Sequence, residues 1–177
     1  MRVSLTPHPS TLQSPVESID VDIRRGGDRL GLTYRVRGDT GRILWPTHAG
    51  PITIESLASA GRKEELWKHT CFEAFISTDE GYREFNFATT GHWATYRFRG
   101  YRKGMAPAPE EASLTSLEGR GDYLDLGFVI DLPASPERIT LAAVIETVDG
   151  EMSYWALAHP SDKPDFHHPD SFVLDLP

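Results

Sequence analysis

Residues 71–99 read CFEAFISTDEGYREFNFATTGHWATYRFR, and apolar and polar side chains alternate within this stretch. Alternation with a period of two is typical of β-strands, because successive side chains point to opposite faces of a sheet. Two turn sequences, Asp79–Gly81 and Thr89–His92, interrupt the alternation, and Gly and Asp tolerate the tight backbone of hairpins. The stretch therefore predicts three consecutive antiparallel strands over Cys71–Ser77, Tyr82–Ala88 and Trp93–Arg99.

The same alternation recurs along the chain at spacings typical of all-β domains. Met105–Glu118 and Ala158–Pro169 are rich in Pro and polar residues and predict long loops, while Ser59–Lys68 has the composition of one or two helical turns. With 177 residues, 39% of them hydrophobic, the chain predicts one domain over residues 1–177, an all-β, two-sheet antiparallel β-sandwich of the jelly-roll or immunoglobulin-like type. Further strands are expected over Val16–Ile23, Arg29–Val36, Ile52–Ser56, Asp122–Asp131, Arg138–Val148, Met152–Leu157 and Ser171–Leu176.

Strand parity predicts which side chains of the three central strands share a face. We assign the apolar set of each strand to the core, including Ala94, Tyr96 and Phe98 in the third, and merge the opposite faces into one platform. Aromatic rings on such a platform can stack on a ligand while polar groups bond it. The alternative is an ordinary exposed sheet face with cross-strand ion pairs. The platform is predicted to hold Glu73, Phe75, Tyr82, Glu84, Asn86, Trp93, Thr95, Arg97 and Arg99.

Charge and composition argue against several classes of protein. The chain has 18 Lys and Arg against 26 Asp and Glu, a net charge of −8. This disfavours nucleic acid and anionic membrane as partners, because both require a local excess of basic residues. No apolar run approaches the roughly 20 residues that span a bilayer, and none follows Met1–Pro9 as it would in a secretory signal. The single cysteine, Cys71, forms no internal disulfide, so we expect a cytoplasmic location.

Three residues within Leu66–Phe87 carry a family resemblance. Trp67 lies six residues before Glu73, which stands at the start of a strand, and Asn86 lies near the end of the next strand. With this spacing the chain resembles the DOMON-like and family 9 carbohydrate-binding-module superfamily. The segments Trp93–Arg102 and Tyr154–Pro169 are similar to a bacterial subgroup of DOMON-like proteins. The resemblance implies a β-sandwich that binds a sugar or a haem and has no catalytic activity of its own.

The resemblance also implies roles for individual residues. Trp67 would stack against a pyranose ring, and Glu73 would accept hydrogen bonds from sugar hydroxyls. Sugar-binding members carry a second stacking tryptophan before the last strand, where this chain has Phe166–His168. Haem-binding members use a Met and a His as axial ligands, and the internal methionines here are Met105 and Met152.

Three functions other than sugar or haem binding stay open as alternatives. Glu73 and Glu84 could face each other across neighbouring strands as the acid and base of a glycoside-active enzyme. An exposed sheet edge could serve as an interaction module. Imidazole and carboxylate ligands for a metal ion gather in the C-terminal loop, as His159, Asp165, His167, His168 and Asp170.

The sequence as a whole predicts a small-molecule binding domain for a carbohydrate or a related polyhydroxylated ligand. In this prediction the tryptophans stack on the ligand. The carboxylates and the asparagine side chain form hydrogen bonds with its hydroxyl groups, and the arginines bind a carboxylate or phosphate of the ligand. The sequence identifies no definite cofactor, a haem or a metal ion stays an alternative, and the oligomeric state is not indicated. The predicted ligand-binding residues are Trp67, Glu73, Glu84, Asn86, Trp93, Arg97, Arg99, His159 and His167.

Overall fold

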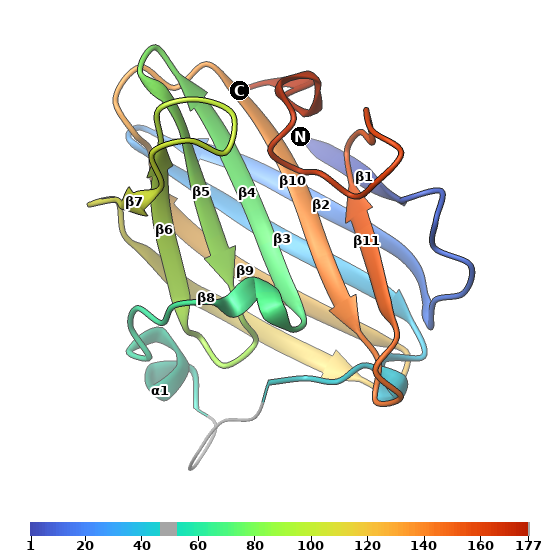
Figure 1. The fold of residues 1–177 in the computed structure, drawn as a ribbon. Helices are drawn as coiled ribbons and strands as arrows, with labels where there is room; N and C mark the ends of the chain where they lie inside the picture. The colour runs from blue at the N-terminus through green and yellow to red at the C-terminus, as the bar shows by residue number, and fades with distance from the viewer. Residues whose placement is uncertain (47–52, 177) are drawn as a thin grey trace.

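The computed structural model describes residues 1–46 and 53–176. This part of the chain is almost entirely β-structure, with one short α-helix, α1 (Ile54–Ala58), and 3-10 turns at Thr40–Arg42, Leu66–Lys68 and Pro169–Ser171 (Figure 1). None of the helices in these ranges has the length and apolar character of a membrane-spanning segment. The strands are β1 (Arg2–Pro7), β2 (Val16–Gly26), β3 (Arg29–Gly38), β4 (Cys71–Thr78), β5 (Gly81–Phe87), β6 (Trp93–Phe98), β7 (Ala106–Pro107), β8 (Ala112–Arg120), β9 (Tyr123–Asp131), β10 (Arg138–Glu146), β11 (Met152–Ala156) and β12 (Leu174–Asp175).

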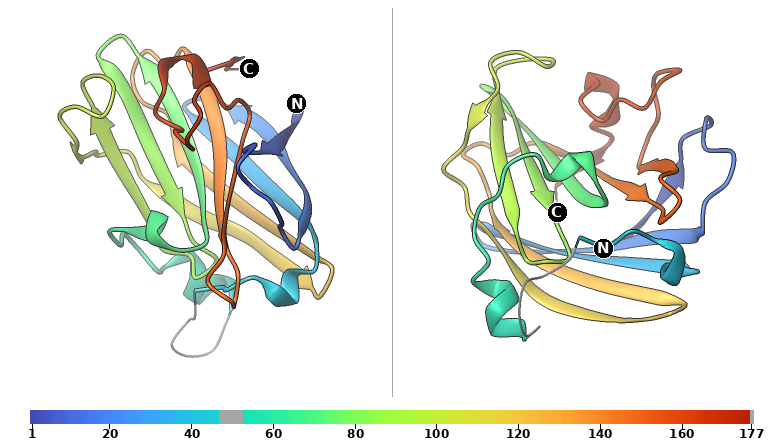
Figure 2. Two further views of the ribbon diagram at one scale, coloured as in Figure 1. Left: turned by 45° about the vertical axis from the view of Figure 1, so that its right-hand side comes forward. Right: turned by 60° about the horizontal axis from the view of Figure 1, so that its bottom comes forward.

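The strands form one antiparallel sheet in the order β7-β6-β5-β4-β10-β11-β1-β2-β3-β9-β8, with β12 beside β10. The sheet curls strongly, so that two halves face each other (Figure 2). We call β4 to β7 with β10 to β12 the front half, and β2, β3, β8 and β9 the back half. Strand β1 joins them, because Arg2–Leu5 pair with β2 whereas Thr6 and Pro7 pair with β11. The all-β antiparallel prediction is confirmed, whereas two separate sheets are not.

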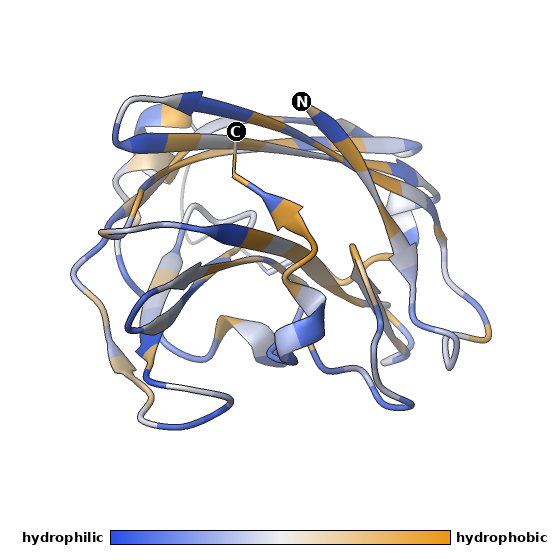
Figure 3. Ribbon diagram, turned by 90° about the horizontal axis from the view of Figure 1, so that it is seen from above, coloured by the Kyte–Doolittle hydropathy of each residue, from blue (hydrophilic) through white to orange (hydrophobic). Residues whose placement is uncertain are grey.

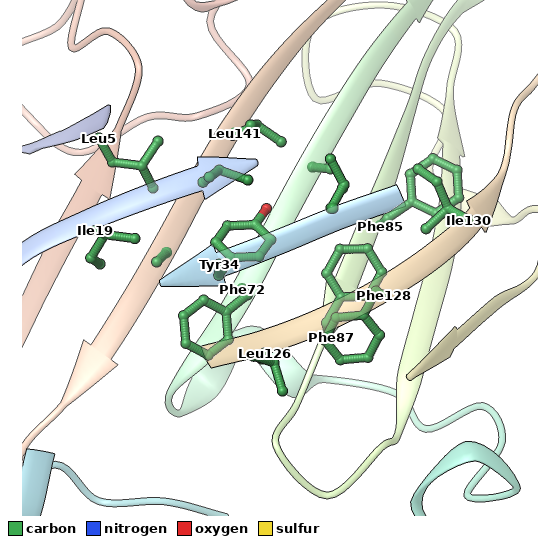
Figure 4. Packing of buried hydrophobic residues seen from close by; sticks show 14 of the residues in the cluster. Leu5, Ile19, Tyr34, Phe72, Phe85, Phe87, Leu126, Phe128, Ile130 and Leu141 are labelled. Carbon is green, nitrogen blue, oxygen red and sulfur yellow. The ribbon is translucent and has the colours of Figure 1, made fainter. Parts of the chain in front are cut away.

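The main core lies between the two halves. Apolar side chains at alternate positions of both halves point into it, as the alternating hydropathy of the strands indicates (Figure 3). Phe87 of the front half stacks on Phe128 of the back half, with 4.4 Å between ring centroids (Figure 4). Tyr34 is fully buried, and its hydroxyl donates a hydrogen bond of 2.7 Å to the carbonyl oxygen of Glu73. This bond ties β3 to β4 across the core.

A second apolar cluster covers the outer face of the front half, on the side away from the main core. The C-terminal segment 157–173 crosses this face and contributes Phe166 and Phe172 (Figure 1). Strands β4, β5 and β6 are therefore buried on both faces along most of their length. The other fully or largely buried members are Phe75, Tyr82, Ala94, Tyr96, Phe98, Ala142, Val144 and Ala156.

Two segments take a different secondary structure from the predicted one. The strand predicted over Ile52–Ser56 is wrong, because Thr53 caps helix α1 there; Ile52 lies outside the described residues. The backbone N–H of Ser56 donates to Oγ1 of Thr53, and the backbone N–H of Thr53 donates to Oγ of Ser56, each at 3.1 Å. The helix predicted over Ser59–Lys68 is reduced to the 3-10 turn at Leu66–Lys68.

The sequence pattern missed three strands, β7 and β8 at the two ends of the sheet order and β1 in its middle. The predicted loop Met105–Glu118 contains β7 and most of β8, and strand β1 was not predicted. Strand β8 lies at the edge of the sheet and buries only Ala112 and Leu114 of its nine residues, so its alternation is weak. A strand that buries few side chains leaves little hydrophobic pattern in its sequence.

The hydroxyl group of Tyr34 tests the contact between the two halves. Changing Tyr34→Phe removes the donor and leaves a buried carbonyl with one partner fewer, so we expect the free energy of unfolding to fall by about 1–2 kcal/mol. The matched control is Tyr123→Phe, whose hydroxyl bonds the exposed Glu118 and whose loss should change stability by under about 0.5 kcal/mol. Urea denaturation measures both values, and equal effects of the two changes would contradict the structure.

Candidate functional site

A cavity of about 440 Å³ opens on the outer face of the front half. The C-terminal segment and the loop between β6 and β7 border it, and it lies within the range of small-molecule sites. Its wall is mostly aromatic and apolar, and four polar side chains, Glu73, Glu84, Arg102 and His167, reach it. The aromatic and apolar part of the wall consists of Trp67, Phe98, Met105, Val144, Tyr154, Pro164 and Phe166.

A second hollow, of about 370 Å³, lies on the outer face of the back half. Three of its charged side chains pair with one another, because Arg35 bonds Asp22 at 2.9 Å and also bonds Asp125. Such cross-strand ion pairs are ordinary features of an exposed sheet face. The cavity of the front half is therefore the better candidate, since polar atoms in it lack partners.

The register between β4 and β5 brings two carboxyl groups to this cavity. Glu73 lies opposite Asn86, and Glu84 lies opposite Phe75, so all four side chains share the outer face. The segment that covers this face leaves Glu73 only 3% and Glu84 only 4% exposed. Two acidic side chains are thus enclosed on adjacent strands in a diagonal arrangement.

Each carboxyl group keeps an oxygen without a hydrogen-bond partner among the described residues. The amide Nδ2 of Asn86 donates to Oε1 of Glu84 at 2.7 Å, and the Cys71 thiol lies 3.6 Å from Oδ1 of that asparagine. Oε1 of Glu73 and Oε2 of Glu84 receive no bond from the described chain. Buried polar atoms are normally paired, so these two oxygens mark a place for a ligand atom or a bound water.

Burial changes the protonation of both carboxyl groups. Burial, together with the charge of Glu84, holds the pKa of Glu73 well above its usual range, although Arg102 lowers it. Burial also raises the pKa of Glu84 to about 7, against the hydrogen bond from Asn86 and the charge of Arg102, which lower it. Both carboxyl groups therefore keep their protons to a higher pH than ordinary glutamates do, and each can donate a hydrogen bond when protonated and accept one when ionised.

His167 reaches the cavity from the C-terminal segment and is held by Tyr82. The phenol oxygen of Tyr82 accepts a bond from the backbone N–H of Arg102 at 3.2 Å and lies 2.8 Å from Nδ1 of His167. We assign the phenol proton to the bond with Nδ1, which leaves the imidazole proton on Nε2. Nε2 lies 3.7 Å from Oε2 of Glu84. Burial and the nearby Arg102 lower the pKa of His167 to about 4, so the ring is neutral at pH 7.

Arg102 sits in the tight loop that follows β6, with φ of +52°. Its guanidinium Nη2 donates to Oδ1 of Asp165 at 2.8 Å, and the hydroxyl of Tyr101 bonds Oδ2 of the same carboxylate. Asp165 also accepts a bond from the backbone N–H of His167 at 3.2 Å. One carboxylate therefore fastens the C-terminal segment to the β6–β7 loop and fixes the border of the cavity.

Trp67 forms another part of the wall. It belongs to the 3-10 turn Leu66–Lys68 just before β4, and its ring packs edge-on against Tyr96, with 5.5 Å between centroids. Buried Thr70 anchors the beginning of β4, because its hydroxyl donates to the carbonyl oxygen of Leu44 at 2.8 Å. These contacts hold the indole beside the two carboxyl groups.

The structure brings four of the nine predicted site residues together and places a fifth behind them. Trp67, Glu73, Glu84 and His167 line the cavity. Asn86 is fully buried and bonds Glu84 without lining the cavity, so it is a positioning residue.

The predicted placement of Trp93 on the same face is wrong. Phe87 pairs with Trp93 and Glu84 pairs with Tyr96, so even residues of β6 share the outer face with Glu84. Trp93 instead belongs to the main core, where the guanidinium carbon of Arg62 lies 4.6 Å from its ring centroid. The assignment failed because β6 carries apolar side chains on both faces. Apolar residues at alternate positions therefore do not show which face of this strand points into the main core.

Three further predicted site residues also lie away from the cavity. Arg97 shares the parity of Trp93, and Arg97 and Arg99 are exposed beside Arg83 in a separate shallow hollow. His159 packs edge-on against His8, and its Nε2 lies 2.8 Å from the carbonyl oxygen of Thr6. These contacts do not connect any of the three to Glu73 or Glu84.

Sequence reasoning missed several residues of the cavity. Tyr82 was placed on the platform but not among the site residues, and Arg102 and Tyr154 were assigned no role at the site. The position of Phe98 could have been predicted from the sequence, because the length of the turn after Phe87 determines which residues of β6 share the outer face with Glu84. No local signal exists for Arg102, whose position depends on contacts with the distant C-terminal segment.

The residues at the cavity do not fit a haem. Met105 and His167 both line it, but Nδ1 of His167 is engaged by Tyr82 and Nε2 faces Glu84. Two buried carboxyl groups would lie against an apolar macrocycle. Among residues 1–46 and 53–176, no group of three or more His, Cys, Asp or Glu side chains is arranged to hold a metal ion.

Comparison with known proteins adds no relative. A scan of protein-family models and a search of curated proteins both found no match to this sequence. Function is therefore inferred from the chemistry of the cavity.

The raised pKa of Glu84 predicts a specific dependence of stability on pH. Because the pKa rises from 4.5 to about 7 on folding, the folded state binds more protons, and this contribution to stability is lost as pH rises through that window. The loss is on the order of 3 kcal/mol for a shift of this size. We expect Glu84→Gln to lack this part of the decline when urea denaturation is measured from pH 4.5 to 8.

The control for this prediction is Glu17→Gln, which changes an exposed carboxylate on β2. It should keep the pH dependence of the parent protein. A Glu84→Gln curve parallel to that of the parent protein would show that Glu84 titrates normally in the folded state.

Proposed function

We propose that this protein binds a small polyhydroxylated molecule of the carbohydrate class in the cavity of the front half. The observation that carries the proposal is the pair of buried oxygens, Oε1 of Glu73 and Oε2 of Glu84, that lack a partner at an aromatic-lined cavity. A hydroxyl group can donate to one such oxygen and accept from a protonated carboxyl group beside it. The pair therefore suits a ligand with neighbouring hydroxyl groups.

The remaining wall supports the same ligand class. Trp67 and Tyr154 offer ring surfaces on which the C–H groups of a sugar can pack. The cavity, at about 440 Å³, is within the size range of small-ligand sites and leaves room for a ligand of one or two rings. Most of the wall is apolar, and its polar groups converge on one region, as in sites that orient a ligand by a few hydrogen bonds.

Membership of the DOMON-like superfamily is also a proposal. The all-β fold agrees with it, and Trp67 and Glu73, two of the three residues that carry the resemblance, line the cavity. Asn86, the third, supports Glu84 from behind. In this proposal the curled sheet is a variant of the β-sandwich in which β1 connects the two layers.

A glycoside-active enzyme is the second candidate, favoured by the two buried carboxyl groups on neighbouring strands. Hydrolysis of a glycosidic bond uses one protonated carboxyl group as acid and one carboxylate as base or nucleophile. Glu73 and Glu84 supply two carboxyl groups at one cavity, and burial raises the pKa of both. Release of nitrophenol from nitrophenyl glycosides distinguishes this candidate from binding alone.

The binding proposal predicts which substitutions weaken a sugar ligand. In isothermal titration calorimetry against a panel of mono- and disaccharides, we expect the wild-type protein to bind at least one of them. Trp67→Ala and Glu73→Ala should each weaken that binding at least tenfold, about 1.4 kcal/mol or more, because they remove a ring surface and a buried hydrogen-bonding group.

Arg97→Ala and His159→Ala are the controls, because both residues lie away from the cavity. They should leave the affinity within about twofold, under 0.5 kcal/mol or so. Circular dichroism establishes that each variant is folded. Absence of binding by the wild-type protein to the whole panel, or equal losses in the control variants, would overturn the proposal.

A further inference from the structure

The carboxyl pair of the cavity has no cationic partner in the described part of the chain. Of the ion pairs within residues 1–46 and 53–176, none includes Glu73, and the one that includes Glu84 joins it to His167 at 3.7 Å. His167 is neutral at pH 7, because burial and Arg102 keep its pKa low. Buried carboxylates are normally matched by a cation, so the ionised form of this pair lacks a balancing positive charge.

Arg102 is the arginine at the cavity, and its charge is already matched. Its guanidinium donates to Asp165 at 2.8 Å, and the same carboxylate holds the loops around the cavity together. Moving the guanidinium toward Glu84 would break that contact and leave Asp165, itself mostly buried, without its cation. The interior of the cavity therefore keeps an excess of negative charge whenever Glu84 is ionised.

The wall of the cavity also suits a positive charge. The faces of aromatic rings attract cations, and indole attracts them most strongly. Trp67, Phe98 and Tyr154 lie on the wall beside the carboxyl pair. An ammonium group has three N–H donors, and Oε1 of Glu73 and Oε2 of Glu84 are two acceptors that lack a donor.

We propose that the ligand carries a protonated amine that pairs with Glu73 and Glu84, as in an amino sugar or another polyhydroxylated amine. This inference rests on the proposed function and narrows its ligand class. The amine enters as an ammonium ion and pairs with the ionised form of the carboxyl pair. Where a carboxyl group of the pair still holds its proton, that proton is released to the buffer on binding.

The pH dependence follows from the groups around the pair. Affinity should rise from pH 5.5 to 7, because Glu84 becomes ionised while the amine stays protonated. Strand β10 contributes Ala142 and Val144 to this region, and the same face of the strand carries the buried hydroxyl of Thr140 and, farther along, the carboxyl group of Glu146 next to His69. The other titratable or charged groups around the cavity are Cys71 on β4, Tyr82 on β5, Tyr96 on β6, Tyr154 on β11, Arg102 in the β6–β7 loop, and Asp165 and His167 in the C-terminal segment.

Matched sugars test the proposal by isothermal titration calorimetry. The probes are glucosamine with glucose and N-acetylglucosamine, and galactosamine with galactose, each titrated into the protein at pH 7. We expect at least one free amino sugar to bind ten times or more tightly than its uncharged counterpart. Titrations in buffers of different ionisation enthalpy should reveal the released proton.

Two isosteric variants assign the effect to the pair. Glu84→Gln and Glu73→Gln keep the shape of the side chains and should reduce the preference for the amine to less than threefold. Glu17→Gln, on β2 in the back half, should leave the preference for the amine unchanged. A preference that persists in both cavity variants would overturn the assignment to the carboxyl pair.

The outcomes separate this inference from the proposed function. Equal binding of the amino sugars and the uncharged sugars overturns the inference and leaves carbohydrate binding intact. Binding of propylamine without binding of any sugar supports the amine site and overturns the carbohydrate proposal. Absence of binding to every probe overturns both.

Discussion

The register between strands β4 and β5 is the constraint on which the candidate site depends. It places Glu73 opposite Asn86 and Glu84 opposite Phe75, so both carboxyl groups emerge on the outer face of the front half. A shift of one residue in either strand would move its acidic side chain into the main core. The hydroxyl of Tyr34 bonds the carbonyl oxygen of Glu73 from the opposite half, so the core itself helps to hold this part of β4 in place.

Burial on both faces turns an ordinary sheet surface into a site with unusual chemistry. Carboxyl groups on an exposed face would be ionised and hydrated. Here the C-terminal segment covers them, and Asp165 fastens that segment to the loop of Arg102. Burial then raises the pKa of Glu73 and Glu84 and lowers the pKa of His167. The covering segment, far away in the sequence, is therefore as important for the chemistry as the strands that carry the carboxyl groups.

The central strands could be predicted from the sequence because their core-facing side chains alternate clearly with the others. Parity within β4 and β5 correctly placed Glu73 and Glu84 on one face, and the spacing of Trp67 from Glu73 brought the indole to the same region. The parity of β6 was misassigned, because its outer face is also apolar. The place of Arg102 at the cavity could not be predicted, since it depends on a contact with Asp165, 63 positions away in the sequence.

The protonation of the two glutamates is the central claim of this account. Carbon-13 NMR of the glutamate side-chain carboxyl carbons, recorded from pH 3 to 9, follows each group directly. The account predicts that Glu84 titrates near pH 7 and that Glu73 titrates well above the usual range of a glutamate. Titration of both groups near 4.5, the ordinary value of a glutamate, would show that neither is enclosed as described, and it would contradict the account.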